Sequence, residues 1–230
     1  MVIHGLQKMT MLDFPGKVAC TVFTAGCNLR CPFCHNARLV THCEAEDRLS
    51  DTEVLAYIEK RKGLLEGVCI TGGEPLLQPD IADFLAKIKA LGLAVKLDTN
   101  GCFPEKLRAL VEEGLVDYVA MDIKNSPLEY AKTVGVEDFN ISAVEQSKNF
   151  LLSGAVDYEF RTTVTPELHT AQSVAEAADW IKGAKRYFLQ GFVDSGDLID
   201  GSFTSPSKEF MKELQQKAIP FVGNVELRGV

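Results

Sequence analysis

The sequence predicts an α/β protein, built as a partial, open (β/α)6 barrel in a single domain of residues 1–230. Six short, apolar, β-rich runs alternate with segments whose apolar residues recur at helical spacing. The polar residues with the most useful chemistry follow these runs, where a parallel sheet gathers its strand ends. Strands that alternate with helices imply right-handed crossovers and a parallel sheet, which together favour this fold class.

The first strand is predicted to begin at Val18, because residues 18–23 form an apolar run. Ser50 and Glu53 then match a capping box, in which each side chain satisfies a backbone N–H of the other, and this predicts a helix over Asp51–Arg61. Residues 67–71 form the second β-rich run. The helix after it is predicted from apolar residues three and four positions apart: Ile81, Phe84, Leu85, Ile88 and Leu91.

The same alternation continues through the rest of the chain. Further strands are predicted at residues 94–97, 116–121, 158–164 and 187–192, and further helices near residues 105–112, 141–152, 171–181 and 207–217. Residues 192–206 are rich in Gly, Ser and Asp and predict a mobile loop that covers or borders the open mouth of the barrel.

Composition excludes several classes of function. The chain has 230 residues, of which 46% are hydrophobic, so it can bury a full core. Its formal charge of -8 makes nucleic acid an unexpected ligand, since the only dense basic run is Lys60-Arg61-Lys62. No export signal is evident, and no apolar stretch approaches the roughly 18 residues that a membrane span needs. We therefore expect a cytoplasmic protein with no membrane partner.

Three of the seven cysteines stand close together. Cys27, Cys31 and Cys34 follow the first strand at C-x3-C-x2-C spacing, and Pro32 disfavours a helix between them. A loop around a compact inorganic centre suits this segment. Three thiolates match an iron–sulfur cubane with one open iron, and a structural zinc site would need a fourth ligand, from His35, His42 or Cys43.

Other residues have plain structural interpretations that stay open. Cys20 and Cys69 lie in apolar runs and are predicted to be small buried hydrophobic side chains. A double glycine, or the run from Asp98 to Gly101, is by itself only a turn.

His4, His42 and His169 are predicted to be incidental. Asp122 and Lys124, two residues apart, are predicted to share one face of a strand. Arg161, charged within a strand-like run, requires a partner.

The cysteine segment, with Phe33 before its third cysteine, resembles the signature of the radical S-adenosylmethionine (SAM) superfamily. Within it, Cys34-His35-Asn36 is similar to the activating enzymes of glycyl-radical enzymes. Residues 5–17 resemble the activating proteins of anaerobic ribonucleoside-triphosphate reductase. The similarity runs through most of the chain, without the ferredoxin-like insert that some activating enzymes carry. It implies a partial barrel of the radical SAM type.

The resemblance also implies a set of site residues. Cys27, Cys31 and Cys34 would bind a [4Fe-4S] cluster, and the chain would supply no catalytic residue beyond the cluster and SAM. Contacts to SAM would come from Phe33, Gly72, Gly73, Glu74, Thr99, Asn100, Asp122, Lys124, Arg161 and Gln190. Similarity to pyruvate formate-lyase activating enzyme implies a monovalent cation at Asp98, Thr99 and Asp122. Gln190 stands where related enzymes often have a histidine, and an amide cannot titrate.

The function implied by the resemblance is one-electron chemistry. The enzyme would cleave SAM reductively and generate a glycyl radical on a partner enzyme, most plausibly anaerobic ribonucleoside-triphosphate reductase. Its electrons would come from a low-potential donor such as flavodoxin or ferredoxin. The alternatives are an activase of another glycyl-radical enzyme, of the pyruvate formate-lyase type, a small-molecule enzyme such as a deazapurine carboxylate synthase, and a non-enzymatic metal-binding module.

Overall fold

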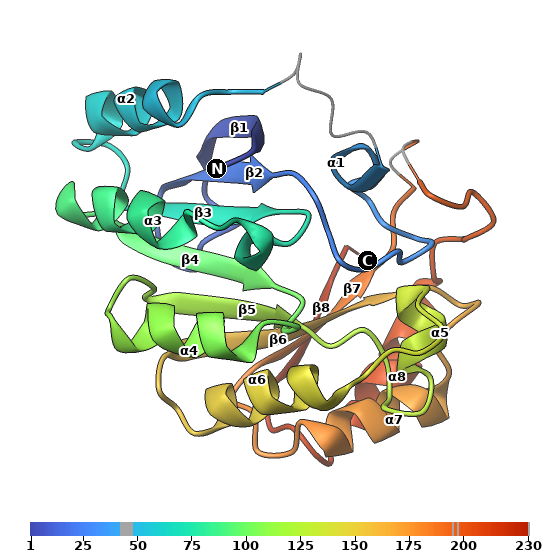
Figure 1. The fold of residues 1–230 in the computed structure, drawn as a ribbon. Coiled ribbons are helices and arrows are strands. Elements are labelled where there is room, and N and C mark those ends of the chain that lie inside the picture. The colour runs from blue at the N-terminus through green and yellow to red at the C-terminus, as the bar shows by residue number, and fades with distance from the viewer. Residues whose placement is uncertain (42–47, 195, 197, 230) are drawn as a thin grey trace. The chain divides into compact units, whose positions relative to one another are not determined.

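The computed structural model describes residues 1–41, 48–194, 196 and 198–229. The chain divides into two compact units (Figure 1). The first unit contains Met1–Asn28, Arg38–Thr99 and Phe103–Ala120, and the second contains Leu29–Ala37, Asn100–Cys102 and Met121–Val230. Each unit combines parallel strands with helices.

In the first unit, β1 (Ile3–Thr10) pairs antiparallel with β2 (Ala19–Thr24). β2 pairs parallel with β3 (Gly67–Gly72), and β3 pairs parallel with β4 (Ala94–Thr99). The helices here are α2 (Asp51–Arg61), the 3-10 helix η2 (Pro75–Leu77), α3 (Ile81–Ala90) and α4 (Pro104–Glu112), together with most of α1 (Ala37–Thr41). The chain passes to the second unit within β5 (Tyr118–Asp122).

Burial and capping explain these elements. The predicted capping box is present at the start of α2, where Ser50 Oγ accepts the N–H of Glu53 at 3.2 Å and the Glu53 carboxylate accepts the N–H of Ser50 at 3.0 Å. The predicted apolar face of α3 is buried and packs against β4. Apolar burial of this kind supplies most of a helix's stability in a protein.

In the second unit, β6 (Asp157–Val164), β7 (Tyr187–Gly191) and β8 (Val225–Arg228) are parallel and adjacent in that order. The helices are α5 (Tyr130–Val134), α6 (Ser142–Leu152), α7 (Ala171–Trp180) and α8 (Lys208–Ala218). α7 and α8 pack on each other, and α8 also contacts β7 and β8 (Figure 1). Large buried aromatic side chains, among them Tyr158, Phe160 and Tyr187, fill the interior.

The six predicted strands correspond to β2 through β7, which confirms the α/β class. β5 begins at Tyr118, two residues later than predicted, because Asp117 binds the chain at the start of β4: its carboxylate accepts the N–H of Val95 at 2.7 Å and pairs with Lys89. The sequence did not predict β1, β8, α1 or α5. β1 is largely exposed along its middle, and the other three have only four or five residues each, so their periodic signal is weak.

Among the described residues, β1 pairs only with β2 and β8 only with β7, so these two edges do not close a barrel, as predicted. The described part of residues 192–206 contains no helix or strand, and its mobility stays a prediction. The single-domain assignment likewise stays a prediction. No helix of the described chain has the length and hydrophobicity that crossing a membrane requires.

Candidate functional site

The cysteine segment follows β2. Cys27 belongs to the first unit, and Cys31 and Cys34 belong to the second. Cys31 is buried, and its carbonyl accepts the N–H of Cys34 at 3.1 Å, which closes a tight turn. Two further backbone bonds hold this turn within its unit: the N–H of Arg30 donates to Val134 O at 2.9 Å, and the N–H of Asp200 donates to Pro32 O at 3.0 Å. These backbone bonds contribute to holding the turn in place.

The alternative fourth ligands divide between described and undescribed residues. His42 and Cys43 lie outside the described residues. The ring of His35 stacks on that of Phe192 with a centroid separation of 5.1 Å. Over the described residues, no three or more His, Cys, Asp or Glu side chains form a group arranged to hold a metal ion. The ligand set of Cys27, Cys31 and Cys34 therefore rests on their spacing.

Phe33 is buried next to the ring of His169. The two rings meet edge to face with centroids 6.3 Å apart. Nδ1 of His169 accepts the N–H of Thr165 at 3.1 Å, so Nε2 carries the proton and donates to Lys124 O at 2.9 Å. Burial lowers the pKa of His169, which keeps the ring neutral. The side chain of His169 therefore connects Phe33 to the residues that follow β5, and the prediction that it is incidental to function stays a prediction.

The double glycine at the end of β3 touches the backbone that leads into the cysteine segment. Gly72 has φ +120°, and a Cβ there would lie 2.2 Å from Thr24 O. A Cβ on Gly73 would lie 2.0 Å from Gly26 O. The N–H of Gly73 donates to Thr24 O and the N–H of Glu74 donates to Gly26 O, both at 2.8 Å. Only glycine fits this approach of two chain segments.

Glu74 is the fully buried carboxylate that follows the two glycines. Its Oε1 accepts the N–H of Leu76 at 3.0 Å, which caps η2, and the hydroxyl of Thr99 at 2.9 Å. These contacts hold the carboxylate in one orientation. A buried carboxylate at the end of a strand is the type of group that binds an ammonium, and this role of Glu74 stays a prediction.

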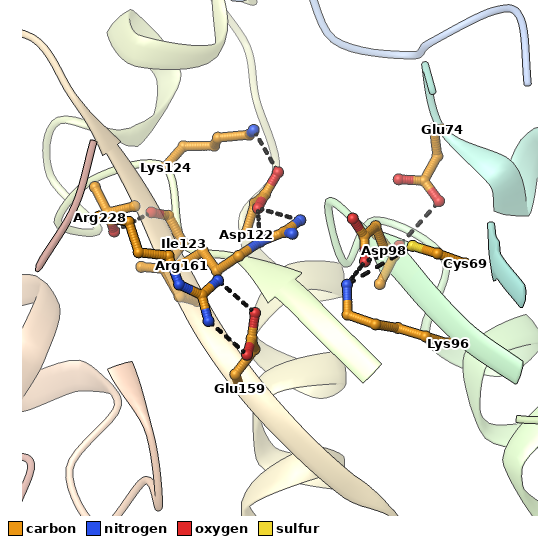
Figure 2. A network of polar contacts seen from close by, with 12 residues as sticks. Cys69, Glu74, Lys96, Asp98, Asp122, Ile123, Lys124, Glu159, Arg161 and Arg228 are labelled. Carbon is orange, nitrogen blue, oxygen red and sulfur yellow. Dashed lines mark hydrogen bonds and ion pairs between the residues drawn. The ribbon is translucent and has the colours of Figure 1, made fainter. Parts of the chain in front are cut away.

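Lys96 is a second charged group that the first unit buries, and the sequence analysis missed it. Its side chain is only 2% exposed, and its ammonium pairs with Asp98 Oδ1, which is 13% exposed (Figure 2). Lys96 stands opposite Cys69 in the β3–β4 register, and the thiol lies 3.8 Å from both Lys96 Nζ and Asp98 Oδ1. A lysine inside the apolar run of β4 was the available sequence signal.

Asp122, at the end of β5, is bound by two cationic side chains of its own unit (Figure 2). Lys124 Nζ lies 2.8 Å from Oδ2, and the Arg161 guanidinium contacts Oδ1 with Nε at 3.1 Å and a terminal nitrogen at 3.0 Å. The predicted juxtaposition of Asp122 and Lys124 is therefore present, and Asp122 is the partner that Arg161 required. Two cations share one anion, so the group carries a net positive charge.

Opposing effects act on the pKa values of this cluster. Burial raises the pKa of Asp122, but Lys124 and Arg161 outweigh burial and lower it to about 2. Burial lowers the pKa of Lys124, but Asp122 and then Cys31 raise it further, so the pKa lies above its usual value and the ammonium stays charged. Lys124 is therefore a permanent cation within electrostatic range of one cluster cysteine.

We predict that Asp122→Asn lowers the free energy of unfolding by about 2 kcal/mol at neutral pH. The folded pKa of Asp122 is about 2 and the unfolded value is 3.8, so this stabilisation is fully present above the unfolded pKa and is lost as pH falls towards 2. Urea unfolding of both cluster-free proteins between pH 7 and pH 2.5 measures the effect. The stability difference should stay constant down to about pH 5 and then shrink. A difference that grows on acidification would contradict the assignment.

The remaining predicted contacts lie at other strand ends. Asn100 follows β4, and its Oδ1 accepts the N–H of Cys102 at 3.0 Å, which forms the predicted turn. Gln190 is partly exposed near the end of β7, opposite Arg228 in the register with β8. Arg228 pairs with buried Glu159 at 3.0 Å (Figure 2). Its guanidinium also lies over the ring of Phe188.

The fold and these strand-end groups define a class of protein: a parallel α/β enzyme that gathers charged side chains at the ends of its strands. The sequence model of the radical SAM superfamily matches residues 21–145, and the chain belongs to that superfamily. The match covers the cysteine segment, the double glycine and the Asp122–Lys124 pair. It confirms the predicted enzyme class, fold type and cofactor pair, a [4Fe-4S] cluster and SAM.

Similar proteins support this assignment. The chain is 29% identical, over 100% of its length and 96% of the relative's, to a Methanocaldococcus jannaschii protein assigned as a glycyl-radical enzyme activating enzyme. It is 36% identical to a pyruvate formate-lyase-activating enzyme of Listeria monocytogenes, over 53% of this chain and 52% of that relative. The crystal structure of Streptococcus suis SuiB bound to S-adenosylmethionine has a TM-score of 0.70 and 14% identity over 90% of this chain and 49% of that one, which shows a shared fold.

Proposed function

We propose that this enzyme generates a glycyl radical on a partner protein, and that the partner is an anaerobic ribonucleoside-triphosphate reductase. The match along the full length of the activating-enzyme relative supports the activase. The reductase is proposed from the resemblance of residues 5–17. The alternative partner is a glycyl-radical enzyme of the pyruvate formate-lyase type, as in the Listeria relative.

The chemistry of the charged strand-end groups is the observation that carries the proposal, because an anion and a pair of cations are the partners that the ammonium and the carboxylate of a methionyl group require. Glu74 offers a fixed, buried carboxylate to an ammonium in the first unit. Lys124 and Arg161, which together outweigh Asp122, offer positive charge to a carboxylate in the second unit. Charge-assisted hydrogen bonds of this kind are stronger than neutral ones and orient their ligand.

Cys27, Cys31 and Cys34 would hold the cluster, and Phe33 and Asn100 would contact SAM from within the second unit. When bound, the cluster and SAM supply the one-electron chemistry that removes a hydrogen atom from the Cα of a glycine. The chain orients SAM through fixed charges, and the buried rings around Phe33 exclude water. No side chain of the protein needs to gain or lose a proton in this scheme.

Formation of 5'-deoxyadenosine tests the proposal. The anaerobically reconstituted and reduced protein would be given SAM, with and without the anaerobic reductase of the same source. We expect product and a glycyl-radical signal in electron paramagnetic resonance that both depend on the reductase. Parallel reactions would contain a pyruvate formate-lyase-type enzyme or a pterin substrate.

Each outcome separates the candidate functions. If product rose only with the pyruvate formate-lyase-type enzyme, that enzyme type and not the reductase would be the partner. If a pterin were converted without any protein partner, the protein would be a small-molecule enzyme and not an activase. If protein with full cluster occupancy formed no 5'-deoxyadenosine, radical chemistry would be overturned. Comparison of flavodoxin and ferredoxin as reductants would identify the electron donor.

A further inference from the structure

The environment of Lys96 points to a function for this side chain. A lysine is rarely buried without a specific partner, and Lys96, at 2% exposure, has the carboxylate of Asp98 as its partner. Both residues come from β4 and are two positions apart, so their side chains leave the same face of the strand. From β3, the thiol of Cys69 approaches Lys96 Nζ at 3.8 Å. The structure therefore places the ammonium of Lys96 beside the carboxylate of Asp98.

Asp98 is one of the three residues for which the resemblance implies a monovalent cation. The other two also have partners within their own units. The hydroxyl of Thr99 donates to Glu74 at 2.9 Å, and Asp122 is bound by Lys124 and Arg161. The partners of these residues do not fit a metal cation, since the negative charge of each carboxylate is already balanced by a protein cation of its own unit.

We propose that the ammonium of Lys96 is a built-in cation that takes the place of a monovalent metal ion at Asp98. An ammonium has the charge of K⁺ and a similar size, and it is tethered to the strand that carries its anion. A second cation at the same carboxylate would be repelled by it. Lys96 is then a positioning residue, because it fixes the orientation of Asp98 without touching the reacting atoms.

The inference rests on the proposed function where it concerns SAM cleavage, but its central claim concerns the cation alone. It predicts that the wild-type enzyme requires no monovalent metal ion. It also predicts that removal of the ammonium creates a site for one, because a largely buried carboxylate that has lost its counter-ion attracts a small cation. The cation is then the variable that an experiment can control.

The experiment compares wild-type protein with Lys96→Met in buffers of equal ionic strength that contain Na⁺, K⁺ or tetramethylammonium, which is too large to enter. Without cluster or SAM, the thermal midpoint of Lys96→Met should rise in Na⁺ or K⁺, and the ²³Na resonance should broaden. The wild-type protein should show neither change. In the SAM cleavage assay, the cleavage rate of Lys96→Met should be about tenfold lower in tetramethylammonium and should recover with K⁺. The cleavage rate of the wild-type enzyme should change by less than about twofold between these buffers.

The double variant Lys96→Met/Asp98→Asn is the matched control. It removes both charges of the pair, so its thermal midpoint and the ²³Na line width should be indifferent to the cation. The proposal would be overturned if the thermal midpoint of the wild-type protein depended on Na⁺ or K⁺. It would also be overturned if the thermal midpoint of Lys96→Met did not change with these ions. A Lys96→Met protein that folds in no buffer would also overturn it, because a free cation would then not replace the ammonium. The stability and NMR measurements remain decisive if SAM cleavage is absent in all variants.

Discussion

Replacing Cys31 with alanine should abolish formation of 5'-deoxyadenosine, with the product falling to the level of a reaction that contains no protein. The chain offers three thiolates for the cluster, and loss of one leaves too few ligands to hold it. Iron content and 5'-deoxyadenosine yield after anaerobic reconstitution measure the effect. Cys27→Ala and Cys34→Ala should behave alike.

Cys102→Ala is the matched control, because Cys102 lies in the turn after β4 and outside the cysteine segment. Its iron content and its yield should stay close to those of the wild-type enzyme. Turnover at the wild-type rate by a Cys31→Ala protein without a cluster would refute the proposed chemistry. Loss of iron in Cys102→Ala as well would mean that the cluster ligands are assigned incorrectly.

Gly73→Ala should destabilise the fold by about 3 kcal/mol or more, a value at the upper end for overpacking. The added methyl group would meet the carbonyl of Gly26 at 2.0 Å, and this neighbour is backbone, so it cannot turn aside as a side chain would. The displaced residue directly precedes Cys27. We therefore expect both a lower urea midpoint and reduced cluster occupancy.

Gly63→Ala is the matched control for this substitution. A Cβ at Gly63 meets no atom within 4 Å, and its φ is not in the left-handed region. This variant should keep its cluster and lose little stability. A Gly73→Ala protein with normal stability and a full cluster would show that the two chain segments approach less closely than the structure describes.

The positions of several charged residues near strand ends were predictable from the sequence. The α/β alternation indicates where each strand ends, so Glu74, Asp98 and Asp122 could be selected without knowledge of their contacts, and their roles stay predictions. The alternation of side chains along a strand also brought Asp122 and Lys124 together. Cys20 is fully buried, as predicted, and burial raises the pKa of its thiol to about 12.

The contacts of Lys96 with Cys69 and of His169 with the backbone could not be predicted from the sequence, because they depend on the tertiary structure. Lys96 pairs with Asp98 and contacts the thiol of Cys69 on the neighbouring strand. His169 forms hydrogen bonds with the backbone of Thr165 and of Lys124. Backbone groups are the same in every residue type except proline, so the sequence does not indicate such partners. Similarly, the partner protein depends on surfaces that no motif defines.

The backbone bonds of the turn that carries Cys31 and Cys34 have a consequence for the cost of ordering this segment. Fixing the backbone of one residue costs about 1–2 kcal/mol, and the bonds of the turn to Val134 and Asp200 contribute towards that cost. Zinc fingers, by contrast, obtain their folding free energy from the metal. In this protein, bonds between chain segments share that task with the group that the three cysteines would bind.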